Sequence, residues 1–121
     1  MDYLVIPAYE PDYNLIRLIK KVREKSDFEV IVINDGSSAS CKRVFEQAAT
    51  YATVLHHSLN QGKGQALKTA FRYIHSQGHY GVIVTADADG QHKLWDILRV
   101  ANAAHEQPQK LILGARSFTG K

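Results

Sequence analysis

The sequence has little that would place it outside the cell or in a membrane. It contains a single cysteine, Cys41, so no disulfide can form within the chain. The apolar run after Met1-Asp2-Tyr3 is too short for a secretory signal. No apolar stretch approaches the roughly 20 residues needed to cross a bilayer. We therefore predict a cytoplasmic protein without a membrane span, and association with the inner face of a membrane stays open.

Clusters of charge of one sign are also missing. The chain has 15 basic and 12 acidic residues, a formal charge of +3, and no run of five like charges. Nucleic-acid-binding proteins usually gather Lys and Arg into a stripe, so we expect no nucleic-acid partner. The length of 121 residues, with 45% of them hydrophobic, fits a single soluble domain spanning residues 1–121.

Short apolar runs alternate with segments of helical periodicity along the chain. Strands are predicted at residues 3–7, 29–34, 53–56, 80–86 and 110–114. Helices are predicted at 12–25 with Asp12 as N-cap, after a cap at Ser37 or Ser38, at 62–76 and at 93–106. Repeated βα units predict an α/β, Rossmann-like fold: a three-layer αβα domain with a mostly parallel sheet.

Polar and small residues follow the predicted strands, in the segments 7–11, 34–38, 60–64 and 87–92. In an open α/β sheet, ligands bind outside the carboxyl ends of the strands, near the point where the strand order reverses. These segments therefore predict a binding site along one edge of the sheet.

Asp87 and Asp89 are the most informative pair. In an extended segment, residues i and i+2 project to the same side, and two neighbouring carboxylates repel unless a cation neutralises them. Oxygen ligands favour Mg²⁺ or Mn²⁺, and such an ion can bridge to a diphosphate and stabilise it as a leaving group. The alternative interpretation is that both residues only form a turn and cap a helix.

Two further positions indicate a ligand. Asp35 ends a buried strand, where its carboxylate or the neighbouring amides could recognise a base or a ribose hydroxyl; an Asx turn through Asp35-Gly36 is the alternative. Gly62-Lys63-Gly64 opens a helix, whose free N–H groups favour an anion, although the spacing is not that of a Walker P-loop.

The six histidines show no spacing typical of metal ligands. We predict solvent-exposed or edge positions for five of them: His56, His57, His75, His79 and His105. His92 is more informative, because it follows the acidic pair directly.

The chain resembles the family-2 inverting glycosyltransferases of the GT-A fold, in particular the branch that includes dolichyl-phosphate-mannose synthases and polyprenyl glycosyltransferases. The resemblance depends on the segments Ile6–Glu10, Val32–Ser38, Asn60–Ala66 and Ala86–His92, which come in the family's order and at its spacing. It covers nearly the whole chain. It implies transfer from a nucleoside-diphosphate sugar, UDP- or GDP-linked, to a polyprenyl phosphate or a glycan of the cell-envelope polysaccharide kind.

The resemblance also implies roles for single residues. It places Asp35 at the base, Asp87 at the ribose or diphosphate, and Asp89 on the Mg²⁺ or Mn²⁺ ion, with Gln91 as a further ligand. The full set of implied nucleotide-binding residues is Pro7, Ala8, Tyr9, Glu10, Asp35, Lys63, Asp87, Ala88 and Asp89.

The end of the chain resembles the family less closely. Leu113-Gly114-Ala115-Arg116 is similar to the family's Gly-Ser-Arg segment, with Ala115 where Ser is commoner. Arg116 would then reach an acceptor phosphate.

Family members continue beyond the position of Lys121 with the acceptor site and the general base. A base must lie within hydrogen-bond reach of the attacking hydroxyl, and no residue here is an obvious substitute. The isolated chain is therefore expected to bind a nucleotide but to transfer sugar poorly or not at all. A bare sheet edge near Leu111 to Leu113 would also favour a homo-oligomer.

Other functions remain open on the sequence. A haloacid-dehalogenase-type phosphatase also uses Asp-x-Asp-Gly, but normally at the end of its first strand. A dinucleotide oxidoreductase would need G-x-G-x-x-G after its first strand, and this pattern is missing. A sugar nucleotidyltransferase would need a Gly-rich loop with Arg at the same position, and this loop is missing too. The strongest alternative is non-catalytic: a truncated nucleotide-sugar-binding module, or one half of a split transferase.

Overall fold

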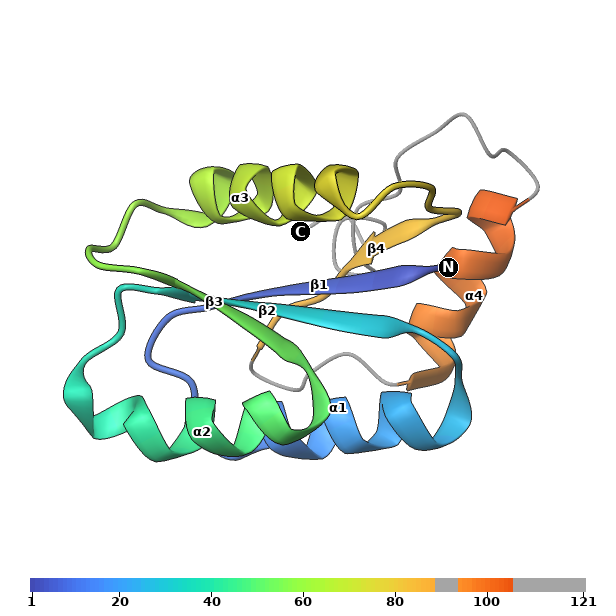
Figure 1. Cartoon of the computed structure of the whole chain (residues 1–121). Helices are drawn as coiled ribbons and strands as arrows, with labels where there is room; N and C mark the ends of the chain where they lie inside the picture. Colours follow the sequence, from blue (N-terminus) through green and yellow to red (C-terminus); the bar gives the residue numbers. More distant parts are fainter. Residues whose placement is uncertain (89–93, 106–121) are drawn as a thin grey trace.

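The computed structural model of the chain describes residues 1–88 and 94–105 (Figure 1). Strands and helices alternate in this part of the chain, as predicted. The elements are β1 (Tyr3–Ala8), α1 (Asn14–Lys25), β2 (Glu29–Asp35), the 3₁₀ turn η1 (Ala39–Cys41), α2 (Lys42–Tyr51), β3 (Thr53–His57), α3 (Lys63–Ser76), β4 (Ile83–Thr85) and α4 (Leu94–His105).

The four described strands form one parallel sheet in the order β3-β2-β1-β4. The chain runs outward from β1 through β2 to β3 and then crosses back to place β4 on the other side of β1. The strand order therefore reverses between β1 and β4, which is the position where ligands bind in folds of this kind.

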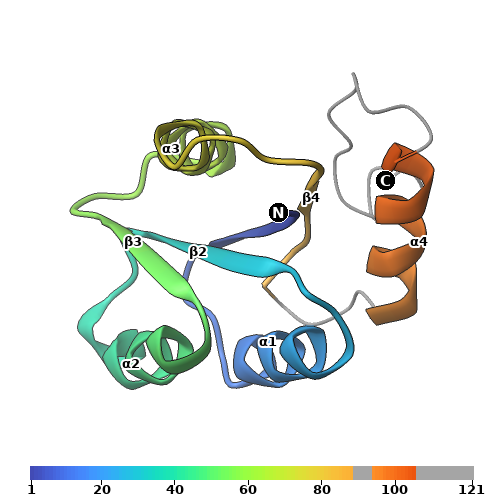
Figure 2. The ribbon, with the colours of Figure 1, turned by 45° about the vertical axis from the view of Figure 1, so that its right-hand side comes forward.

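Helices cover both faces of the sheet. Figure 2 shows α1 and α2 on one face, α3 on the other, and α4 beside β4. Two groups of buried side chains hold these layers together. Leu4, Ile6 and Val32 pack toward α1 and α2, whereas Val5, Ile31 and Ile33 pack toward α3. This is the three-layer α/β arrangement predicted from the sequence.

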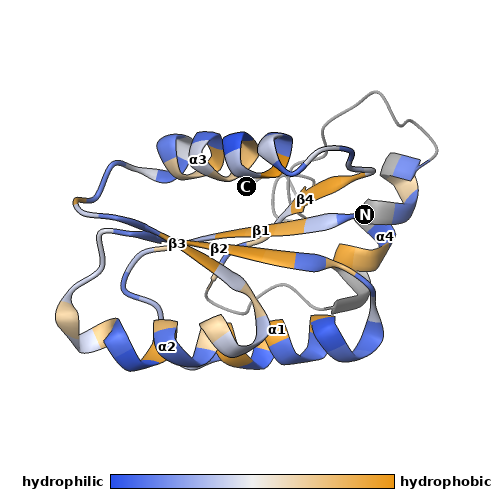
Figure 3. Ribbon diagram, viewed as in Figure 1, coloured by the Kyte–Doolittle hydropathy of each residue, from blue (hydrophilic) through white to orange (hydrophobic). Residues whose placement is uncertain are grey.

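Strand β2 shows why the sheet is parallel and covered on both sides. Its residues Val30 to Ile33 are consecutive in sequence and all buried, because alternate side chains enter the two opposite cores. In α1, the apolar residues Leu15, Leu18, Ile19 and Val22 recur at helical spacing and form the buried side of the helix. Figure 3 shows the same division in colour, with apolar residues in the strands and on the inner faces of the helices.

Some predicted boundaries are wrong. The fourth strand was expected at residues 80–86, but β4 begins at Ile83, which pairs with Tyr3, the first residue of β1. Before Ile83 the ladder is irregular, although the Val82 carbonyl still accepts a 2.8 Å hydrogen bond from the Tyr3 amide. The Gly81 amide donates to the Met1 carbonyl, and the Val82 amide donates to the Asp2 carboxylate and not to a backbone carbonyl.

Helix caps also differ from the prediction. Tyr13, not Asp12, occupies the N-cap of α1, although the Asp12 carboxylate accepts a 2.9 Å hydrogen bond from the Asn14 amide. Ser38 occupies the N-cap position of η1, as one of the two predicted caps, but its hydroxyl caps no helical amide. The predicted strand at 110–114, and with it the sheet edge near Leu111, lies outside the described residues. Within the described ranges, the structure contains no helix long and apolar enough to cross a membrane.

Candidate functional site

The carboxyl ends of the four described strands meet at one edge of the sheet, because all four strands are parallel. The loops that follow β1, β2, β3 and β4 therefore gather at this edge, on the left in Figure 1. We call this edge the rim. It contains the segments 7–11, 34–38 and 60–64 and residues 86–88, so the structure brings together the described parts of all four predicted loops.

Asp35, the last residue of β2, is the centre of a hydrogen-bond network on the rim. Its carboxylate accepts bonds from the backbone amides of Gln61 and Gly62, both at 2.9 Å, and from the Asn60 side chain at 3.2 Å. The fourth donor is Nδ1 of His57, 2.8 Å from Oδ1. A carboxylate has about four lone-pair positions, so these donors occupy all of them.

Burial and hydrogen bonding act in opposite directions on Asp35. Only 5% of its side chain is exposed, and this burial on its own raises the pKa of the carboxyl group. The hydrogen bonds from His57, Gln61 and Gly62 outweigh burial, so the pKa of Asp35 lies below its ordinary value. Asp35 is therefore a buried, charged carboxylate at neutral pH.

His57, the last residue of β3, was predicted to be solvent-exposed or at an edge; it lies on the edge strand of the described sheet, but its side chain is not solvent-exposed. Only 8% of its side chain is exposed. Its Nε2 lies 2.8 Å from the Thr69 hydroxyl in the second turn of α3, while its Nδ1 contacts Asp35. The strand-end position of Asp35 was the available signal, because a buried carboxylate needs a partner. The other described histidines, at 56, 75, 79 and 105, are exposed as predicted.

Gly36 allows the loop between β3 and α3 to lie directly against the end of β2. Its φ is +73°, and a Cβ at this position would be 2.2 Å from the Asn60 nitrogen and 2.4 Å from the Leu59 carbonyl carbon. No side chain fits into that space. The Asp35-Gly36 pair therefore contributes both the hydrogen-bond acceptor and the bare backbone against which residues 59–62 pack.

Lys63, the first residue of α3, reaches across the rim to the end of β4. Its Nζ lies 3.3 Å from Oδ1 of Asp87, and the two side chains are 58% and 18% exposed. A pair this exposed contributes little to stability. It does bring a cation and an acidic group together beside the position where the strand order reverses.

The loop after β1 is fixed by Glu10. This residue has a φ of 51°, which is uncommon for a residue with a side chain. Its carboxylate accepts hydrogen bonds from the backbone amide and the hydroxyl of Ser38, and its own amide donates to the Ser37 hydroxyl at 2.9 Å. The bond from the Ser38 amide is the main reason why the pKa of Glu10 is lowered. Next to it, Tyr9 is 58% exposed.

The remaining predicted residues differ in how they could meet a ligand. The Ala8 side chain is buried in the core and Ala88 packs against the same core, so mainly their backbones face the rim. Pro7 is half-buried. The predicted residues Asp89, Gln91, His92 and Arg116 lie outside the described residues. In the ranges that are described, no group of three His, Cys, Asp or Glu side chains could hold a metal ion.

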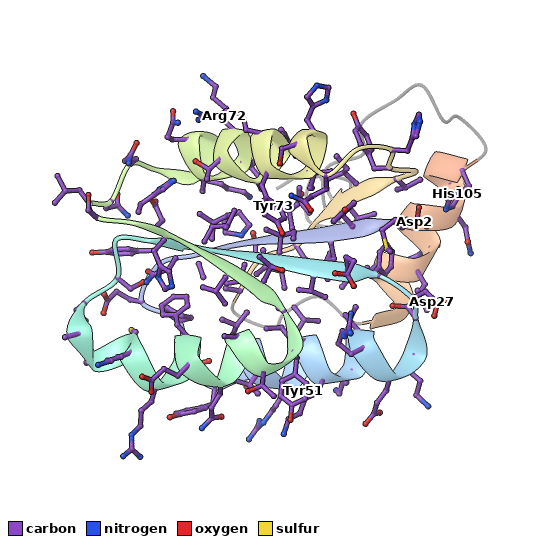
Figure 4. All side chains as sticks on the ribbon, in the orientation of Figure 1. Asp2, Asp27, Tyr51, Arg72, Tyr73 and His105 are labelled. Carbon is purple, nitrogen blue, oxygen red and sulfur yellow. The ribbon has the colours of Figure 1, made fainter. Side chains whose placement is uncertain are left out.

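A second hollow lies at the opposite end of the sheet. A cavity of about 450 Å³ is lined by residues that include Met1, Asp27, Phe28 and Asn102. Beside it, Nε2 of His105 lies 2.8 Å from Oδ2 of Asp2, which ties the end of α4 to the start of β1 (Figure 4). This cavity is at the amino ends of the strands, so it is separate from the rim.

The fold and the rim define a Rossmann-like α/β domain whose polar residues gather where the strand order reverses. Comparison with known proteins identifies the family. Residues 3–121 match the family described as Glycosyl transferase family 2, and the chain belongs to this family. No solved structure matches the chain.

Several curated proteins are similar to the chain. A dolichyl-phosphate beta-glucosyltransferase of Saccharomyces cerevisiae is 30% identical over 114 residues, covering 83% of this chain and 33% of that protein. A UDP-N-acetylglucosamine–dolichyl-phosphate N-acetylglucosaminyltransferase of Methanococcus voltae is 23% identical over 129 residues, covering 94% and 51%. An uncharacterized protein of Methanocaldococcus jannaschii is 25% identical over 118 residues, again covering 94% and 51%. The chain thus spans about half, or less, of these relatives.

Proposed function

We propose that the chain is the donor-binding part of a glycosyltransferase that takes its sugar from a nucleoside diphosphate. The nucleotide would bind along the rim, with the diphosphate between Lys63 and the loop after β4. The single observation that carries this proposal is the 3.3 Å approach of Lys63 Nζ to Asp87 at the point where the strand order reverses.

The charge around α3 supports an anionic ligand. No Asp or Glu occurs between Glu46 and Asp87, a stretch that includes β3, α3 and β4. Lys63, Lys68 and Arg72 are all exposed on α3. The amides of the first helical turn have no partner further back in the helix, and they add partial positive charge at Lys63. A diphosphate at this end of α3 would therefore meet a positive potential.

We propose that a divalent ion, Mg²⁺ or Mn²⁺, is bound by the oxygen ligands that follow β4 in the sequence. Asp89 would hold the ion, with Gln91 as a further ligand, while Asp87 faces the ribose or diphosphate. When bound, the ion would neutralise the diphosphate and stabilise it as a leaving group. The Lys63 ammonium group lies 3.3 Å from the Asp87 carboxylate and offsets part of the acidic charge that follows β4. This pairing supports a site at which carboxylates bind cations.

The structure suggests different roles for the other rim residues. Tyr9 is exposed and offers an aromatic face to a base, and Glu10 holds its loop in position. Asp35 was predicted to contact the base. Its four internal donors mean that such a contact would have to displace one of them, so we propose that Asp35 shapes the base pocket through the loop it holds.

The relatives support a lipid-linked acceptor. Their names describe transfer to dolichyl phosphate in yeast and Methanococcus voltae, and to undecaprenyl phosphate in Proteus mirabilis and Micrococcus luteus. We propose that the protein to which this chain belongs acts on a polyprenyl phosphate. Such an acceptor would bring the protein to a membrane surface.

The nucleotide is tested by thermal unfolding of the purified chain. UDP, GDP and their sugars are added with and without Mn²⁺, and one of the two bases is expected to stabilise the fold only with the metal. At a ligand concentration a hundred times the dissociation constant, the gain is about 2.7 kcal/mol, or roughly 10 °C for a domain of this size.

Two variants sharpen the test. Lys63→Met and Asp89→Ala should each remove most of the metal-dependent stabilisation, because one removes the cation at the diphosphate and the other the metal ligand. Lys68→Met, which removes an exposed cation from the next turn of α3, is the matched control and should keep the stabilisation. Equal stabilisation of wild type and Asp89→Ala would contradict the proposed site.

A further inference from the structure

His57 links three elements, β2, β3 and α3, through buried polar groups near their rim ends. Its imidazole lies between the carboxylate at the end of β2 and the hydroxyl of Thr69 in α3, with both distances 2.8 Å. The Thr69 hydroxyl also lies 3.1 Å from the Gln65 carbonyl oxygen, one turn earlier in α3. A buried chain of polar groups thus runs from β2 through β3 into the first turns of α3.

The direction of these hydrogen bonds follows from their chemistry. The carboxylate of Asp35 can only accept, so Nδ1 of His57 carries a hydrogen and donates. The Thr69 hydroxyl has one hydrogen. If it donates this hydrogen to the Gln65 carbonyl, Nε2 of His57 donates to Thr69; if it donates to Nε2 of His57, Nε2 is the acceptor. In both cases Nδ1 carries a hydrogen and donates to Asp35.

His56, the preceding residue, is held in the opposite way. The Asn34 side chain accepts a hydrogen bond from the Ser37 amide through Oδ1, so its Nδ2 is the donor to Nδ1 of His56 at 3.0 Å. Nδ1 of His56 therefore carries no hydrogen. Two neighbouring histidines at the end of β3 have opposite hydrogen positions, and only that of His57 suits a carboxylate.

We propose that His57 is a positioning residue of the nucleotide site: it holds the Asp35 carboxylate against the amides of Gln61 and Gly62, and so holds Lys63 opposite Asp87. The proposal rests on the proposed function for its effect on binding. The hydrogen bonds on which it depends need no ligand, because all of them are present in the protein alone.

The geometry leads step by step to Lys63. The imidazole fixes Oδ1 of Asp35, which also accepts from the Gln61 amide. Oδ2 then accepts from the Gly62 amide, one residue before α3 begins. Lys63 is the next residue, so the direction in which its side chain leaves the rim depends on the carboxylate. Without the imidazole, the carboxylate could rotate and the amides would lose their common acceptor.

The first test uses the chain without ligand. Nitrogen-15 NMR of the imidazoles should find hydrogen on Nδ1 of His57 and none on Nδ1 of His56. Amide hydrogen exchange at Gln61 and Gly62 should become about tenfold faster in His57→Leu and in Thr69→Val, since a buried acceptor is lost or loosened. His57→Asn should keep the slow exchange, because its amide group can still donate to Asp35.

The second test measures the affinity for the nucleoside diphosphate found by the thermal panel, with Mn²⁺ present. His57→Leu should weaken binding about tenfold and Thr69→Val by about threefold, because Lys63 is less well positioned. His57→Asn should restore most of the affinity. His75→Leu and Thr50→Val, at exposed positions on α3 and α2, are the matched controls and should bind as wild type.

The outcomes separate this proposal from the proposed function. If the wild-type chain binds no nucleotide, the proposed function fails, and the exchange rates still decide whether His57 holds the loop. If the wild type binds while His57→Leu binds equally well with unchanged exchange, the positioning role is overturned and the function stands. Thr69→Val provides the same decision if His57→Leu does not fold.

Discussion

Two aspartates at the same edge of the sheet have opposite surroundings. Asp35 follows β2, is almost fully buried and accepts hydrogen bonds from four donors of the loop and strand beside it. Asp87 follows β4, is 18% exposed and lies 3.3 Å from the ammonium group of Lys63, a side chain that is 58% exposed. The first accepts only from groups that shape the loop beside it. The second is paired with an exposed cation beside the point where the strand order reverses.

This difference indicates a division of work along the rim. The β2–β3 side holds the loop from which Lys63 emerges through internal hydrogen bonds, so it can position groups without touching a ligand. The β4 side presents charge, which is what a metal ion and a diphosphate require. The largest effects on stability should therefore come from the β2–β3 side, and the largest effects on binding from the β4 side.

The largest expected loss of stability comes from Gly36→Ala, compared with Gly62→Ala. Both glycines have positive φ, but a Cβ on Gly36 would be 2.2 Å from the Asn60 nitrogen, whereas nothing lies within 4 Å at Gly62. We expect a loss of about 4 kcal/mol for Gly36→Ala and about 1 kcal/mol for Gly62→Ala. Urea unfolding measures both. Similar losses for the two variants would mean that the backbone of Leu59 and Asn60 does not pack closely against Gly36.

Asp35→Ala should come next, with a loss of about 3 kcal/mol, because it leaves His57 and two backbone amides buried without their acceptor. Lys63→Met should change the free energy of unfolding by only about 0.5 kcal/mol or less, since its ion pair is exposed. Asp27→Asn, an exposed acidic position, serves as the control. If Lys63→Met were as destabilising as Asp35→Ala, the contrast between the two sides of the rim would be wrong.

The smallest effect should appear as a dependence on pH. The pKa of Asp35 is lower in the folded protein than in the unfolded chain, so its ionised form stabilises the fold above the unfolded pKa of about 3.9. This contribution is lost as the pH falls through the lower, folded pKa. The difference in free energy of unfolding between wild type and Asp35→Asn should therefore be constant near neutral pH and shrink below about pH 4. A difference that grew on acidification would contradict the lowered pKa.

Much of the fold could be predicted because it depends on local patterns. Val30 to Ile33 are consecutive apolar residues, which is typical of a parallel strand covered on both faces, and the structure buries all four. The apolar residues of α1 recur at helical spacing and form its buried side. The strand ends were also predictable, and with them the edge where the polar loops meet.

Predictions failed where distant segments decide the outcome. Tyr80 looks like part of a strand, but β4 begins at Ile83, and just before it the Val82 amide donates to the Asp2 side chain, 80 residues away in sequence. Ser38 does occupy the N-cap position of η1, yet its hydroxyl donates to Glu10, 28 residues away in sequence, and caps no helical amide. His57 looks like a surface histidine because its partners, Asp35 and Thr69, are 22 and 12 residues away.

The sequence by itself determined the layers of this protein, the order in which its elements follow one another and the loops that carry its polar residues, because apolar periodicity and turn residues act over a few positions. Only the tertiary structure decided which polar groups meet. Which groups surround a carboxylate, and how deeply it is buried, depends on which strands lie side by side and how closely their loops approach one another. For Asp35, that is set by the parallel pairing of β2 with β3 and by the missing side chain of Gly36.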